Sequence, residues 1–154
     1  MWLRVSVCSS NVNVRRQGTR SSYMRMGEEL VPSGQANTEA QRTVLIVEDH
    51  FWTRYTVAEY FRGSGYRVIE ANDANEAVSV LASGNQVHVV FSDIQMPGSM
   101  DGLALADWIA QRYPGLPVIL TSGRRPDVLP ANCRSFFVKP CSLADLEREI
   151  RRLA

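Results

Sequence analysis

Four short apolar runs in this 154-residue chain each end at a residue that can take part in chemistry. Their terminal residues are Glu48 and Asp49, Asp93, Thr121 and Lys139. Carboxylates that crowd together repel one another unless a cation neutralises them, and Mg²⁺ prefers oxygen ligands. An acid beside a divalent cation, a hydroxyl and an amine suggests phosphoryl transfer to a carboxylate. The spacing therefore raises the question of whether the fold brings these residues together.

Strand-like and helix-like patterns alternate from Thr43 onward, and they must position these residues. β-branched and apolar runs predict strands near 44–47, 66–69, 87–93, 117–120 and 135–138. Helical spacing predicts helices around Phe51, Tyr55, Ala58 and Phe61, from the cap Asp73 to Gly84, near 105–113 and from Ser142 to Leu153. Asp73 and Glu76 have the spacing of a capping box.

Five strands alternating with helices predict an α/β fold with a doubly wound five-stranded parallel sheet. Neighbouring strands lie about 4.8 Å apart, and ligands bind beyond the carboxyl ends of such strands. All the candidate residues follow strand ends. We therefore expect them to meet at one edge of the sheet, with Asp93 on the central strand.

The connection from 124 to 134 differs from the others because it contains Pro126 and Pro130. Proline inside a helix costs roughly 3 kcal/mol. The fourth helix is therefore expected to be shortened or irregular, without a regular helix of two or more turns.

Residues 1–42 lack a sustained period and contain turn-forming stretches such as Pro32-Ser33-Gly34. They hold six arginines against three glutamates, whereas the rest of the chain has a small acidic excess. We expect a flexible N-terminal extension over 1–42 and a single domain over 43–154. The net charge of +1 gives no reason to expect nucleic acid as a direct partner.

The three cysteines, Cys8, Cys133 and Cys141, show no metal-binding spacing, so free thiols in a reducing compartment are expected. No apolar run approaches the roughly 20 residues that a membrane helix needs. We expect a cytoplasmic protein with no membrane partner.

Four motifs together resemble the receiver domain of two-component response regulators, of the single-domain type typified by chemotaxis regulators. The motifs are VLIVEDH (44–50), FSDIQMPGSMDG (91–102), VILTSG (118–123) and FFVKP (136–140). The resemblance covers residues 43–154 and implies the flavodoxin-like strand order 2-1-3-4-5. Gly98-Ser99 looks like a one-residue expansion of the family's loop.

The resemblance also implies a role for individual residues. Asp93 would accept a phosphoryl group from a histidine kinase or a histidine phosphotransfer protein, with Mg²⁺ as cofactor. The implied metal ligands are Glu48, Asp49, Asp93 and the backbone carbonyl of Gln95. Thr121 and Lys139 would contact the phosphoryl group, and Phe136 holds the position of the family's switch aromatic. Pro97, Gly102 and Pro140 would shape the adjacent loops.

Three readings compete on the sequence alone. The first is a stand-alone phosphoacceptor that signals to a downstream protein by a conformational change, as a monomer or a homodimer. It is not an enzyme beyond its own phosphorylation and dephosphorylation. The second is a phosphatase with an aspartyl-phosphate intermediate, but Glu48-Asp49-His50 lacks the D-x-D spacing of such enzymes. The third is a binding module that is never phosphorylated, which the complete set of acids, threonine and lysine argues against.

Overall fold

The computed structural model describes residues 23–26, 29–32 and 41–154. The chain divides into two compact units, Met1–Asn37 and Thr38–Ala154. In the first unit, β1 (Tyr23–Met26) and β2 (Glu29–Pro32) form a two-stranded antiparallel sheet, which the sequence patterns did not predict. The expected flexibility of 1–42 concerns residues that lie largely outside the described ranges.

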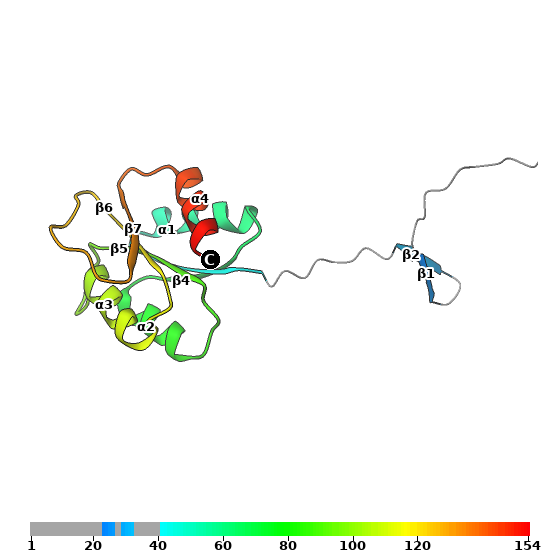
Figure 1. The fold of residues 1–154 in the computed structure, drawn as a ribbon. Coiled ribbons are helices and arrows are strands. Elements are labelled where there is room, and N and C mark those ends of the chain that lie inside the picture. Colours follow the sequence, from blue (N-terminus) through cyan, green and yellow to red (C-terminus); the bar gives the residue numbers. More distant parts are fainter. Residues whose placement is uncertain (1–22, 27–28, 33–40) are drawn as a thin grey trace, which may run out of the picture. The chain divides into compact units, whose positions relative to one another are not determined.

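The second unit is built on a parallel sheet of five strands (Figure 1). The strands are β3 (Thr43–Val47), β4 (Arg67–Ala71), β5 (Val89–Asp93), β6 (Val118–Ser122) and β7 (Cys133–Val138). Their spatial order is β4-β3-β5-β6-β7. Numbered along this unit, the order is 2-1-3-4-5, which confirms the predicted fold class and places β5 at the centre.

Two helices cover each face of the sheet (Figure 1). The helices are α1 (Phe51–Gly63), α2 (Ala74–Ala82), α3 (Gly102–Arg112) and α4 (Leu143–Leu153). Leu45 and Val47 of β3 point into the core beneath α2 and α3, whereas Val44 and Ile46 point toward α1 and α4. This alternation, with β3, β5 and β6 wholly buried, explains why the central strands read as continuous apolar runs.

The predicted helix starts are confirmed by their caps. The Asp73 carboxylate accepts from the Glu76 backbone N–H at 2.8 Å, and Glu76 accepts in turn from the Asn72 N–H at 2.7 Å. Ser142 caps α4, whose Leu146 and Ile150 are fully buried as expected. These caps fix where each helix begins after its loop.

The inward face of α1 is offset from the aromatic spacing noted in the sequence. Val57, Ala58 and Phe61 are buried, whereas Phe51 and Tyr55 remain 55% and 45% exposed. Phe51, Tyr55 and Ala58 do lie on one helix, α1, but Phe51 and Tyr55 lie at the edge of its buried face. The aromatic pair therefore belongs to the surface.

The connection between β6 and β7 contains no helix, which agrees with the expectation of a shortened or irregular fourth helix. Residues 123–132 form bends and turns, and Val128 is 78% exposed there. Across 41–154 and the two short strands, no helix has the length and apolar character needed to cross a membrane.

Candidate functional site

The carboxyl edge of the sheet brings the candidate residues together. Asp93 is the last residue of β5 and pairs in register with Thr121 of β6. Glu48 and Asp49 directly follow β3, and Lys139 directly follows β7. The parallel sheet thus places four consecutive strand ends around Asp93.

Three acids form one cluster at this edge. Glu48, Asp49 and Asp93 each offer a carboxylate oxygen, and these oxygens lie within 4.8 Å of one another. Glu48 and Asp93 are buried, whereas Asp49 is exposed. Within the described residues, no hydrogen bond or ion pair engages the Asp49 carboxylate. An all-oxygen donor set with one open carboxylate fits a hard divalent cation.

Lys139 links the two buried acids. Its Nζ lies 2.8 Å from Glu48 Oε2 and 2.7 Å from Asp93 Oδ2. Burial alone would lower the pKa of Lys139, but its hydrogen bonds to Asp93 and Glu48 outweigh burial and raise that pKa above its usual value. The ammonium therefore stays charged, and three carboxylates around one ammonium leave an excess of negative charge.

Glu48 is buried and partly removed from solvent, whereas Asp49 is exposed to it. Burial raises the pKa of Glu48 above its usual value, although Lys139 opposes that rise. The neighbouring charges of Asp93 and Asp49 add to it. The cluster thus favours a further positive charge near these oxygens.

The loop after Asp93 holds its carboxylate from one side. The Gln95 backbone N–H points to Asp93 Oδ1 at 3.3 Å. The loop closes through the Gly102 N–H, which donates to the Ile94 carbonyl at 3.0 Å. A Cβ on Gly102 would lie 2.1 Å from the Asp93 carbonyl oxygen, so only glycine fits here. Pro97 lies exposed in this loop, next to Gly98 with a φ of +117°.

Thr121 lies beside Asp93 on β6, and Phe136 lies on the next strand, β7, in register with Leu120. Thr121 is fully buried, and its hydroxyl donates to the Phe137 carbonyl at 3.0 Å. Phe136 packs half-buried against the core beneath α2 and α3, with the Arg125 guanidinium 5.5 Å from its ring centroid. In this state the threonine hydroxyl is bonded to β7.

A mainly apolar cavity of about 690 Å³ opens beside the acids. Glu48, Thr121 and Lys139 line it, together with Trp52 of α1 and Pro140 and Cys141 after β7. The cavity lies between the start of α1 and the start of α4, and Glu48 is the acid of the cluster that lines it.

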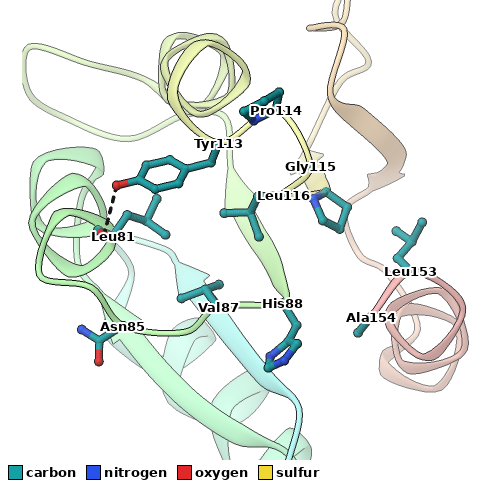
Figure 2. A pocket seen from close by; sticks show the side chains of 11 residues that line it. Leu81, Asn85, Val87, His88, Tyr113, Pro114, Gly115, Leu116, Leu153 and Ala154 are labelled. Carbon is teal, nitrogen blue, oxygen red and sulfur yellow. Dashed lines mark hydrogen bonds between the residues drawn. The ribbon is translucent and has the colours of Figure 1, made fainter.

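A second cavity, of about 460 Å³, lies at the amino ends of the strands (Figure 2). Its polar side chains already have main-chain partners. The Tyr113 hydroxyl donates to the Leu81 carbonyl at 3.1 Å, and His88 Nδ1 accepts from the Thr43 N–H at 2.9 Å. It holds none of the candidate residues, which lie at the carboxyl edge.

Sequence reasoning missed Arg54, which touches the acid pair. Its Nη1 donates to the Glu48 carbonyl at 2.6 Å, and its Nε lies 3.4 Å from Glu70 Oε2. Arg54 stands at positions i, i+3, i+4 and i+7 with the buried Val57, Ala58 and Phe61. A charged residue on the inward stripe of a helix was the available signal.

Comparison with known proteins identifies relatives of the second unit. Residues 44–151 match the family model of the response regulator receiver domain. The transcriptional regulatory protein PdtaR of Mycobacterium tuberculosis is 35% identical over 120 residues, which cover 75% of this chain and 58% of PdtaR. The DNA-binding transcriptional regulator NtrC of Salmonella typhimurium is 42% identical over 77 residues, or 50% of this chain and 16% of NtrC. The chain thus spans little more than half, or less, of these relatives.

Solved structures agree with these relatives. The response regulator TrrA of Thermotoga maritima, in complex with Mg²⁺-BeF, superimposes with a TM-score of 0.68 at 26% identity. The match covers 74% of this chain and all of TrrA. The receiver domain of the hybrid histidine kinase CckA superimposes with a TM-score of 0.61 at 28% identity, covering 72% of this chain and 97% of that domain.

Proposed function

Because this chain belongs to the response regulator receiver domain family, whose members are signalling modules of two-component systems, we propose that Asp93 is its phosphoacceptor. The phosphodonor would be a histidine kinase or a histidine phosphotransfer protein. The observation that supports this best is the position of Asp93. It ends the central strand, 2.7 Å from Lys139 and within the acid cluster.

The transfer step follows from these contacts. A carboxylate oxygen of Asp93 attacks the phosphorus of a phosphohistidine, and the P–N bond breaks with its electron pair leaving to the imidazole. An acyl phosphate forms on Asp93. Lys139 then pairs with the added negative charge, because its ammonium already lies against the Asp93 carboxylate. The Thr121 hydroxyl would turn from Phe137 to a phosphoryl oxygen.

We propose Mg²⁺ as the cofactor, held by Glu48, Asp49, Asp93 and the backbone carbonyl of Gln95. The ion supplies charge neutralisation between the incoming phosphoryl group and the acids. The exposed Asp49 carboxylate supports this assignment, because it has no partner among the described residues. TrrA was solved with Mg²⁺-BeF, and its whole chain superimposes on 74% of this chain.

Acetyl phosphate with Mg²⁺, followed by intact-mass measurement, tests the proposal. The wild-type protein should gain the mass of one phosphoryl group, and Asp93→Asn should gain none. Asp107→Asn is the matched control, since Asp107 is an exposed acid on α3. Labelling of Asp93→Asn at the wild-type level would refute the assignment. Loss of labelling without Mg²⁺, or in Asp49→Asn, would support the metal site.

The proposed output is a conformational change that a downstream protein reads, as a monomer or a homodimer. Phe136 and the helix-free segment 123–132 lie side by side through the Arg125 contact, and they are the proposed site of that change. A cytoplasmic location remains our proposal, consistent with the free thiols of Cys133 and Cys141. We further propose that residues 43–154 carry this function without residues 1–42.

A further inference from the structure

The geometry points to Arg54 as a positioning residue for the metal site, an inference that rests on the proposed function. Arg54 lies on α1 and touches neither Asp93 nor the Asp49 carboxylate. Its guanidinium holds the Glu48 carbonyl, and so fixes the peptide that joins the two neighbouring acids. Through that peptide it sets the direction of Asp49.

Glu48 is fixed at three points, and Arg54 supplies one of them. The Glu48 N–H donates to the Ala71 carbonyl at 3.2 Å, and its carboxylate bonds Lys139. Its carbonyl accepts from Arg54 Nη1 at 2.6 Å. Asp49 follows at once and has no anchor of its own among the described residues. The bond to Arg54 is therefore the contact nearest to Asp49 that restrains it.

Arg54 is itself held by two further contacts, so its position is well defined. Its Nε pairs with Glu70 Oε2 at 3.4 Å, its guanidinium lies 5.8 Å from the Phe51 ring centroid, and its side chain is only 14% exposed. A planar guanidinium can contact the carbonyl, the carboxylate and the ring together. A single ammonium group cannot occupy all three directions.

The charge of Arg54 and its position have opposite effects on metal binding. A positive charge near the acids repels a cation, and Glu70 offsets part of it. A fixed Asp49 carboxylate favours the cation. Residues that orient metal ligands typically contribute about 10- to 100-fold to metal affinity. We therefore expect positioning to outweigh repulsion, which gives the test a definite sign.

The test measures Mg²⁺ affinity by calorimetry in wild type, Arg54→Met and Arg54→Lys. Arg54→Met should bind Mg²⁺ about 10-fold more weakly, and Arg54→Lys should fall between it and wild type. Arg62→Met is the matched control. Arg62 also pairs with Glu70, at 2.7 Å, but does not contact Glu48. The Mg²⁺ affinity of Arg62→Met should stay within about twofold of wild type, because Arg62 does not hold the Glu48 carbonyl.

Phosphorylation by acetyl phosphate separates positioning from general damage. In Arg54→Met, the Mg²⁺ concentration for half-maximal rate should rise, whereas the rate at saturating Mg²⁺ should stay near that of wild type. Unfolding midpoints measured in EDTA show whether each variant is folded. If Arg54→Met is not folded, the comparison is made with Arg54→Lys. Tighter or unchanged Mg²⁺ binding by a folded Arg54 variant would overturn the inference. Failure of wild type to bind Mg²⁺ would instead overturn the proposed function.

Discussion

Thr121 of β6 is the register partner of Asp93 of β5. Its hydroxyl, however, donates to the Phe137 carbonyl of β7, the neighbour of β6 on the other side, at 3.0 Å. Any role of this hydroxyl at a phosphoryl group on Asp93 requires that bond to break. The threonine thus connects the acid cluster with β7. The strand β7 also carries Phe136, which packs on the face of the sheet that α2 and α3 cover.

Thr121→Val should separate phosphoryl uptake from the response to it. Valine matches the shape of threonine but loses the bond to Phe137, which should cost about 1 kcal/mol of unfolding free energy. Asp93 should still be labelled by acetyl phosphate. Chemical-shift changes at Phe136 on phosphorylation should disappear, and Thr121→Ser, which keeps the hydroxyl, should retain them. Full shift changes in Thr121→Val would contradict the proposed coupling.

Gly102→Ala should destabilise the fold strongly. The new Cβ would lie 2.1 Å from the Asp93 carbonyl oxygen and 2.8 Å from Ile94 Cα, and both are backbone atoms that cannot turn away. Overpacking of this kind costs about 1–3 kcal/mol. Urea unfolding measures the loss. Gly115→Ala is the control, because a Cβ there meets nothing within 4 Å. A midpoint for Gly102→Ala equal to that of Gly115→Ala would show that the loop adapts.

Much of the arrangement of the candidate site could be predicted, because its residues lie at strand ends. A buried strand followed by Asp93, or by Glu48 and Asp49, is visible in the sequence, and parallel pairing then brings these acids together. Arg54 could not be found in the same way. A charged residue on the inward stripe of α1 is visible in the sequence, but its contact with the Glu48 carbonyl depends on how α1 packs, which no local pattern contains.

The spacing of Phe51 and Tyr55 predicts a helix but does not say which face of it is buried. Their spacing with Ala58 fits a helix, but two stripes of similar spacing overlap on α1. The residues of α1 that pack into the core beneath α1 and α4 are Val57, Ala58 and Phe61. By contrast, the absence of a helix over 123–132 was predictable, since proline acts through the local backbone.

A carboxylate that joins α1 to α4 should make stability depend on pH. Hydrogen bonds from Tyr60 and Arg151 lower the pKa of Glu147 below its usual value. A lowered pKa in the folded state means that the stabilisation is present above the unfolded pKa, near 4.5, and is lost as the pH falls through the folded value. Glu147→Gln should therefore unfold more easily than wild type at pH 7.

The difference between wild type and Glu147→Gln should shrink as the pH falls below 4.5 and then through the lower folded pKa of Glu147, because a protonated Glu147 is neutral, as glutamine is. Urea midpoints across this range measure it. Tyr60→Phe removes the hydroxyl that bonds Glu147 at 2.9 Å and should reproduce part of the effect. A constant difference at all values of pH would mean that packing, and not the charge of Glu147, connects the helices.

The segment 123–132 should be restrained by Arg125. It has no helical hydrogen bonds, Val128 is 78% exposed, and the guanidinium of Arg125 lies 5.5 Å from the Phe136 ring centroid. A cation–π contact at an exposed site contributes about 0.5–1 kcal/mol. That energy is small for the whole fold but large for a ten-residue connection without a helix. Phe136 thereby anchors the segment to β7.

Arg125→Ala should therefore speed amide hydrogen exchange severalfold over 124–131 while leaving β6 and β7 protected. Arg124→Ala is the matched control, because Arg124 is its exposed neighbour without an aromatic contact among the described residues. If Phe136 moves when Asp93 is phosphorylated, phosphorylation of the wild type should speed exchange over 124–131 by the same factor. Phosphorylation of Arg125→Ala should change its exchange little. Equal exchange in both alanine variants would show that Pro126 and Pro130, not the cation–π contact, restrain the segment.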